Sequence, residues 1–318
     1  MNRLELVRRE QNALSKTLLD VHEETSVEGV LDRANLNFEV ELQELSSQVV
    51  TPMPNSDAGF NVTRVNYTQS GVVRMDNLKP IGVVGERYTP IQNRDAFSTL
   101  QYLQDEGFIT GYEQAGMLGD GQRCFIIARL NDSMTLTDTH HGRIMFATSH
   151  DGSGAFHVRA LAERLFCSNQ IPNLARRGKG VISIRHTTSA NARLQQVKQA
   201  VLSEMRWFDE YQNWYDKMCS TDVDWRVTSA YLNQVAPKRD PKMLSEVERR
   251  NDERRQAKIL DRITGQFNAN IKDTVAALFQ GAVEYSDYDS RGRNADRILM
   301  GRDIEFKSRA WDAAKALV

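Results

Sequence analysis

The feature that most constrains the fold of this chain is a change in hydrophobic period near Ser189. Upstream of this residue, segments such as NFEVELQELSS at 37–47 alternate apolar and polar residues, which is typical of a strand with one face in water. Downstream, apolar residues recur every three or four positions from Leu194 to Met218, which predicts the buried stripe of a long helix. The sequence therefore predicts an α+β fold, in which a β-rich body precedes a helical C-terminal region.

Two glycine-containing stretches predict hairpins that make this body mostly antiparallel. Gly119 and Gly121 flank an aspartate between FITGYEQAGML and QRCFIIARL, and SHDGSG at 149–154 separates HGRIMFATS from AFHVRALAERLFC. An Asp-Gly dipeptide between two β segments favours a tight turn, because glycine tolerates the positive φ that such a turn needs. A further β segment, GVISIRH at 180–186, precedes the change of period.

The histidine and aspartate of SHDGSG raise the question of a catalytic site, but a turn is the favoured interpretation. A catalytic dyad needs the carboxylate within hydrogen-bond reach of the imidazole, whereas neighbouring strand residues point to opposite faces. His150 and His157 could face each other across the hairpin as two ligands of a metal. Two ordinary surface imidazoles are the favoured interpretation of this pair.

These patterns divide the chain into an N-terminal helical segment at 1–35, a β-rich core domain at 36–188 and a helical region at 189–318. In the first segment, residues 2–20 have the spacing of an amphipathic helix, and Ser26 is the expected cap of a short second helix.

The core domain contains one inserted helix, NRDAFSTLQYLQDEG, for which Asn93 is the expected cap and Gly107 the stop. In the helical region, SEVERRNDERRQAKILDR at 245–262 mixes charges of both signs and predicts a solvated helix or a mobile arm. The helically spaced rings of Trp207, Tyr211 and Trp214 could stack on nucleic-acid bases, but burial in the apolar stripe is the favoured interpretation.

Composition sets the class of protein. The chain has 318 residues, 40% of them hydrophobic, and a formal net charge of −1, which is typical of a soluble globular protein. Its cysteines are isolated and odd in number, so they predict neither a disulfide framework nor a paired metal site. The charged N-terminus lacks the apolar core of a signal peptide, and no apolar run approaches the ~20 residues of a membrane span. We therefore expect a soluble, cytoplasmic protein without a membrane partner.

Motifs for catalysis are lacking in the sequence. It contains no HExxH, no phosphate-binding loop that opens a helix and no Gly-x-Ser-x-Gly elbow. We expect neither a cofactor nor a metal, and the balance is against an enzyme. A hydrolase or nuclease remains a third option through four acidic residues that no spacing groups: Glu86, Asp120, Asp151 and Glu163.

One segment departs from the near-neutral charge of the whole chain. Residues 152–201 contain eight basic residues and one acidic residue, a net charge of +7. Such a concentration favours contact with phosphate groups. The alternative is that these cations pair with the acidic remainder, within the fold or across a subunit interface. The candidate nucleic-acid-binding residues are Arg176, Arg177, Lys179, Arg185, His186, Asn191 and Arg193.

Several motifs occur in a fixed order along the chain: a tyrosine and Gln-Asn before the inserted helix, a glycine hairpin, a Ser-His-Asp-Gly-Ser turn and a Cys-x-Asn element. They are found at Tyr88, Gln92, Asn93, Gly119, Gly121, residues 149–153, Cys167 and Asn169. With the later segment AVEYSDYDSRGR, they resemble the phage- and plasmid-like family called domain of unknown function 932 (DUF932), over roughly residues 30–315. The Trp-His pair often found near the N-terminus of that family has no match here.

The resemblance implies the product of a mobile element that acts in a bacterial cytoplasm, and it implies no particular reaction. A β-rich body leading into a basic helix is also similar, at the level of fold alone, to Rad52-like single-strand annealing proteins. The expected function is binding of single-stranded DNA or RNA, as an accessory of annealing or recombination. A homo-oligomer is the assembly considered for this function. The alternative is a non-catalytic interaction protein that binds or inhibits a host factor.

Overall fold

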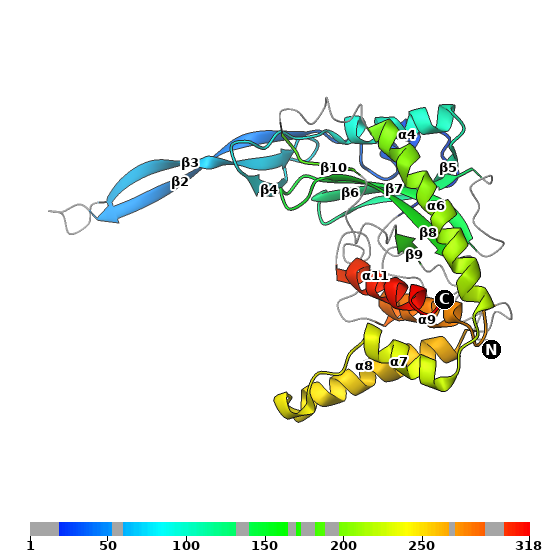
Figure 1. Cartoon of the computed structure of the whole chain (residues 1–318). Helices are drawn as coiled ribbons and strands as arrows, with labels where there is room; N and C mark the ends of the chain where they lie inside the picture. The colour runs from blue at the N-terminus through cyan, green and yellow to red at the C-terminus, as the bar shows by residue number, and fades with distance from the viewer. Residues whose placement is uncertain are drawn as a thin grey trace.

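The computed structural model describes residues 19–52, 60–131, 140–164, 170–172, 182–187, 197–266, 271–289 and 302–318. Within these residues, two antiparallel sheets form the first part of the chain and helices form the last part (Figure 1). The predicted α+β fold, with an antiparallel body and a helical C-terminal region, is confirmed. The division into three regions stays a prediction.

The main sheet contains both predicted hairpins. Its strand order is β1-β5-β6-β7-β8-β10, with β9 also paired to β8, and all of these described pairs are antiparallel. The strands are β1 (Leu19–Asp20), β5 (Ile109–Leu118), β6 (Arg123–Leu130), β7 (His140–Ser149), β8 (Phe156–Arg164), β9 (Gln170–Pro172) and β10 (Ile182–Ile184). The predicted helix over residues 2–20 lies outside the described residues except at its end, where Leu19–Asp20 is a strand instead, because its backbone pairs with β5.

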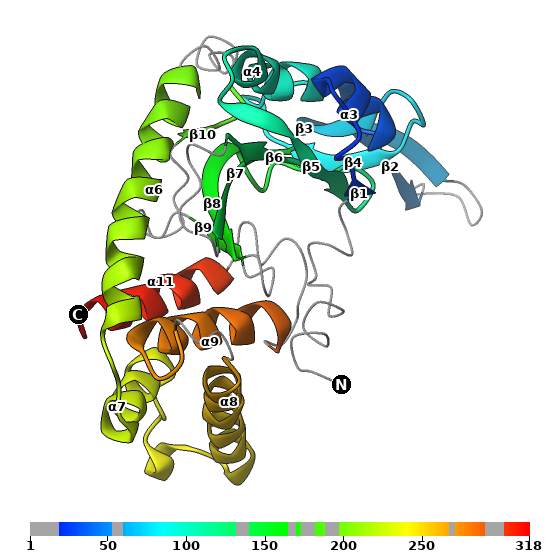
Figure 2. The same ribbon diagram turned by 90° about the vertical axis from the view of Figure 1, so that its right-hand side faces the viewer.

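Helices α3 (Val27–Arg33) and α4 (Asn93–Asp105) pack together over the main sheet (Figure 2). Ser26 caps α3 as predicted, since its Oγ accepts a hydrogen bond from the Gly29 N–H at 3.1 Å. Helix α4 buries the predicted apolar face. The predicted cap of α4 is wrong: Gln92 occupies the cap position, and the Asn93 side chain points into the protein.

A second, three-stranded sheet has the order β2-β3-β4, with β2 at Val40–Pro52, β3 at Phe60–Arg74 and β4 at Pro80–Val84. Strand β4 covers only the base of β3, where its pairing ends at Ser70. Beyond that point β2 and β3 pair only with each other and project from the body as a two-stranded ribbon (Figure 1). We call residues 46–52 and 60–66 the arm.

The arm corrects one expectation from the sequence. The alternation in β2 predicted one buried face, but after Val40 no residue of β2 is buried. The segments FNVTRVNYT and GVVR, expected as separate strands, are continuous in β3. The exposure of β2 follows because β3 is the only described element that it contacts extensively.

The helical region begins with α6 (Val197–Ser220), which packs on β8 and connects the main sheet to the other helices (Figure 2). Its apolar stripe is buried as predicted, and burial of Trp207 and Tyr211 removes both rings from any base-stacking row. The ring of Trp214 is partly buried, with the ammonium groups of Lys217 and Lys315 above it.

The remaining helices are α7 (Trp225–Val235), η3 (Pro241–Met243), α8 (Glu246–Thr264), α9 (Val275–Tyr288) and α11 (Arg302–Lys315). Helix α8 is the predicted solvated helix, and a capping box between Ser245 and Glu248 begins it. Helix α9 is buried on nearly all sides. Its Asp287 forms a fully buried ion pair with Lys307 of α11, with 2.5 Å between Asp287 Oδ1 and Lys307 Nζ. Within the described residues, no helix has both the length and the apolar composition needed to cross a bilayer.

Candidate functional site

The stretch SHDGSG forms the turn between β7 and β8, as predicted. The Asp151 carboxylate holds the turn together, because Oδ1 accepts hydrogen bonds from the Ser149 hydroxyl at 2.6 Å and from the Ser153 N–H at 2.9 Å. Burial opposes ionisation of Asp151, but these hydrogen bonds outweigh it and lower the pKa of the carboxyl. Gly152 has φ +76°, a value that an L side chain rarely adopts.

His150 is completely buried, so the interpretation of this residue as a surface imidazole is wrong. Asn93 fixes the ring: its Nδ2 donates to the Leu36 carbonyl at 2.8 Å, which leaves Oδ1 to accept from His150 Nε2 at 2.8 Å. Burial lowers the pKa of His150 to about 3, and the imidazole is neutral at pH 7. His150 therefore joins the turn to α4, as a structural residue.

His186 follows β10 and is also buried. Its Nδ1 accepts a hydrogen bond from the Ile91 N–H at 3.2 Å, so Nε2 carries the proton and faces the Thr148 hydroxyl at 3.4 Å. Burial lowers the pKa of His186 to about 4. The ring lies parallel to the ring of Tyr88, with centroids 5.1 Å apart and an interplanar angle of 3°.

A cleft of about 980 Å³ opens over this aromatic pair. Its walls come from the base of β3 at Thr68 and Gln69, the loop at 85–88, the turn at 152–155 and the segment at 185–187. Segments that are distant in the sequence therefore meet at one cavity, whose volume is at the upper end of the range for ligand sites.

Two arginines supply positive charge at this cleft. Arg87 and Arg185 both line it and are both exposed, and neither forms an ion pair within the described residues. Glu86 is the one acidic residue among the lining residues. The side chains that face solvent here thus carry a small positive excess, with the flat rings of Tyr88 and His186 beside them.

The three-stranded sheet is tied to the same turn. A Cβ placed on Gly82 of β4 would lie 2.6 Å from the Cα of Asp151, so only glycine lets the two backbones approach this closely. Gln92 anchors the start of β2, because its side-chain amide accepts from the Val40 N–H at 3.0 Å and donates to the Val40 carbonyl at 2.9 Å. The base of the arm and the cleft are therefore parts of one rigid junction.

A family model described as Domain of unknown function (DUF932) matches residues 80–311. The chain belongs to this family. No curated protein and no solved structure matches the chain. Three of the motifs that resembled DUF932 come together in the fold: Tyr88, Asn93 and the turn at 149–153 lie at the cleft or directly beneath it. Cys167 and Asn169 lie outside the described residues.

The candidate phosphate-binding residues of this DUF932 protein are only partly described. Arg185 is exposed at the cleft, and His186 lies below it with both ring nitrogens facing protein partners. The others lie outside the described residues: Arg176, Arg177, Lys179, Asn191 and Arg193. Arg159, which contributed to the charge of the basic segment, is buried and does not face solvent. The sequence reasoning missed Arg87, although it directly precedes the motif tyrosine.

The acidic residues of the hydrolase option have different surroundings, and Glu86 alone among the described ones lines the cleft. Asp120 forms an ion pair with Lys79 at 2.7 Å, Asp151 is bound within the turn, and the side chain of Glu163 is outside the described part. In the part of the chain that is described, no group of three or more His, Cys, Asp or Glu residues could hold a metal ion.

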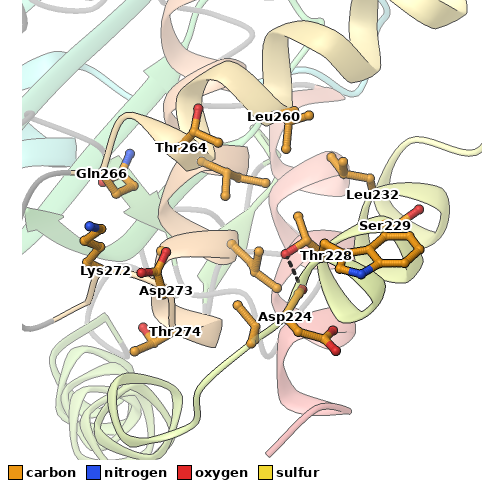
Figure 3. A pocket seen from close by; sticks show the side chains of 15 residues that line it. Asp224, Thr228, Ser229, Leu232, Leu260, Thr264, Gln266, Lys272, Asp273 and Thr274 are labelled. Carbon is orange, nitrogen blue, oxygen red and sulfur yellow. Dashed lines mark hydrogen bonds between the residues drawn. The ribbon is translucent and has the colours of Figure 1, made fainter.

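A second cavity, of about 460 Å³, lies among α7, α8 and the start of α9 (Figure 3). Leu232 and Leu260 lie on one side of it, while Lys272, Asp273 and Thr274 lie on another. Its wall is mostly apolar and contains one cation, so it is less suited to a phosphate backbone than the cleft.

Proposed function

We propose that this DUF932 protein binds single-stranded nucleic acid in the cleft between the 149–154 turn and the loop at 85–88. The observation that carries the proposal is the pair of exposed guanidinium groups, Arg87 and Arg185, at the rim of one cavity. An arginine is a strong ligand for phosphate, since its planar fork can donate two parallel hydrogen bonds.

The aromatic pair supports a single strand over a duplex. Tyr88 lines the cleft and is only half-buried, while His186 supports its ring from one side. Unpaired bases stack on such rings, whereas paired bases within a helix are not available for stacking. Tyr88 is therefore assigned to a base and the two arginines to the backbone.

The charge of the neighbouring sequence agrees with this assignment. Arg185 belongs to the basic segment, and the candidates Arg176, Arg177, Lys179, Asn191 and Arg193 lie on both sides of it in the sequence. The cleft arginine therefore belongs to the segment of the sequence with the highest net positive charge. Each phosphate contact on a single strand contributes about 0.7 to the slope of log affinity against log salt.

The test is fluorescence anisotropy with labelled single- and double-stranded oligonucleotides at two salt concentrations. Charge reversal of both cleft arginines, Arg87→Glu with Arg185→Glu, should lower the salt slope by about 1.4 and weaken binding at low salt. The matched control is Arg249→Glu, an exposed cation on α8 in the helical region, which should leave the slope unchanged.

Substitutions of Tyr88 distinguish the contribution of base stacking to binding from the contribution of charge. Tyr88→Phe keeps the ring and removes the hydroxyl that donates to the Ser149 carbonyl at 3.3 Å, so binding should persist. Tyr88→Leu should weaken binding by about 1–3 kcal/mol without changing the salt slope. Equal affinity of the wild type and the double arginine variant at both salt concentrations would refute the proposed site.

The wider interpretation is that the protein acts in annealing or recombination for a phage or plasmid in a bacterial cytoplasm. It rests on the family resemblance and on the analogy with Rad52-like proteins. The competing function, an interaction protein that binds or inhibits a host factor, predicts no salt-dependent affinity for oligonucleotides and stoichiometric capture of one host protein. The anisotropy titration distinguishes the two.

A further inference from the structure

The arm ends in an apolar face that no other part of the described chain covers. Directly paired residues of an antiparallel ribbon share a face, and Val50 pairs with Val62 while Pro52 pairs with Phe60. These two pairs are separated by one pair, so they lie on the same side of the ribbon. Val50 is 57% exposed, Phe60 63% and Val62 60%. We call Val50, Pro52, Phe60 and Val62 the tip face.

The opposite side of the arm is more polar. The pair between those of the tip face is Thr51 with Asn61, and the next pair on that side is Val49 with Thr63. The apolar residues of the tip are thus concentrated on one side. A concentration of this kind on a soluble protein marks an interaction surface.

The edges of the arm are also open. From Ser46 outward β2 pairs only with β3, and the pairing of β3 with β4 does not extend beyond Ser70. Proteins usually protect such edges with lysines, prolines or bulges. Residues 46–52 and 60–66 contain no lysine, and their single proline is at the end of β2. Such weak protection is expected of an edge and face that a partner covers.

Charge determines which kind of partner fits. Residues 42–52 and 60–70 contain one acidic residue, Glu44, and one basic residue, Arg64. A nucleic-acid backbone requires several cations, so the arm is not suited to follow it. An uncharged, apolar β surface is suited to another surface of the same kind, and a second copy of this chain supplies one through two-fold symmetry.

We propose that the tip face is a self-association surface, on which the arms of two copies of the chain pack together. Four side chains per arm form a small contact, compared with the roughly 1,000 Å² that a stable specific interface buries. We therefore expect a weak dimer that dissociates on dilution.

The experiment is sedimentation velocity of the full chain from about 1 to about 100 µM. The wild type should shift from monomer to dimer over this range. The double variant Val50→Lys with Val62→Lys places four charges in the contact and should stay monomeric throughout. The control is Thr51→Lys with Asn61→Lys, which adds the same charge at the neighbouring pair on the opposite side and should dimerise within about threefold of the wild type.

Three results would overturn the proposal: a wild type that is monomeric at every concentration, a tip-face variant that still dimerises, or a control that loses the dimer equally. The thermal midpoint of each variant at low concentration verifies that the body is folded. The arm tip projects away from β4 and β10, the strands that precede the two cleft arginines in the chain (Figure 1). Oligonucleotide binding by the monomeric variant is therefore a separate result. Failure of one proposal therefore leaves the other standing.

Discussion

The hairpin of β7 and β8 and the hairpin of β2 and β3 are both long antiparallel pairs, yet one is embedded in the protein and the other is surrounded by solvent. In β7, Ile144, Met145, Phe146 and Ala147 are all buried, so both faces of the strand are covered. In the arm, even the largest apolar side chains are more than one-third exposed.

The difference follows from the neighbours rather than from the hairpins themselves. Strand β7 lies between β6 and β8, with α4 against it and α6 against β8. The sequence signals this position, because a continuous apolar run such as IMFA at 144–147 is typical of a strand that is buried on both faces. The alternating pattern of β2 and β3 identifies strands equally well, but it does not show what covers the apolar side.

Truncation of one phenylalanine in each hairpin should show the largest contrast. Phe156 is fully buried against Phe146, with ring centroids 5.9 Å apart, so Phe156→Ala should lower the free energy of unfolding by about 3–5 kcal/mol. Phe60→Ala should change it by less than about 0.5 kcal/mol. Urea unfolding at low protein concentration measures both, and a large loss for Phe60→Ala would mean that the arm packs on the body.

A smaller difference between the two hairpins is expected in how they affect the pH dependence of the free energy of unfolding. The pKa values of His150 and His186 in the folded protein are about 3 and about 4, below the value of about 6.5 in the unfolded chain. As the pH falls below about 6.5, the unfolded chain therefore binds more protons than the folded protein, and the free energy of unfolding decreases. Stability is complete above about pH 6.5 and should decrease by about 2 kcal/mol per histidine by about pH 5. The arm has no histidine and should not contribute.

His150→Gln tests this assignment. The glutamine amide can still donate to Asn93 but does not titrate, so the variant should lose about 2 kcal/mol less than the wild type between about pH 7 and pH 5. Urea unfolding at the two pH values gives the difference. An unchanged pH dependence would mean that His150 is charged or solvated in the folded protein.

Features of the fold that depend on residues close together in the sequence were predicted, and features that depend on contacts between distant residues were not. The two hairpins, α4 and the buried stripe of α6 are determined by residues close in sequence, and their patterns identified them. The projection of the arm depends on the absence of a packing partner, which no local pattern records. The N-terminus of α4 differed for a related reason, because Asn93 bonds to Leu36 and His150 instead of capping its own helix.

The candidate site shows the same limit. The turn at 149–154 was visible in the sequence, and so was the motif residue Tyr88. The burial of His150 could not be predicted, because it results from contacts with Asn93 and Phe38 that are distant in sequence. The presence of Arg87 and Arg185 at one cleft likewise requires the loop after β4 to reach the segment after β10.

Glycine substitutions should test the junction that holds the arm to the body. In Gly82→Ala the new methyl group would meet the Asp151 backbone at 2.6 Å, so one strand must shift, at a cost of about 1–3 kcal/mol. The matched control is Gly111→Ala in β5, where a Cβ meets nothing within 4 Å, and this variant should be neutral or slightly stabilising. Thermal unfolding compares them, and equal midpoints would show that β4 does not press on the turn.

The smallest effect is expected at the ion pair of Lys79 with Asp120, in which Nζ and Oδ1 are 2.7 Å apart. This pair links the three-stranded sheet to the turn between β5 and β6. Both side chains are more than half exposed, so Lys79→Ala should cost less than about 1 kcal/mol, and salt should reduce that cost further. The same turn is also held by Arg74, which is buried and donates to the Asp120 carbonyl at 2.8 Å. If Lys79→Ala cost as much as Gly82→Ala, the exposed pair rather than the close backbone contact would hold the base of the arm in place.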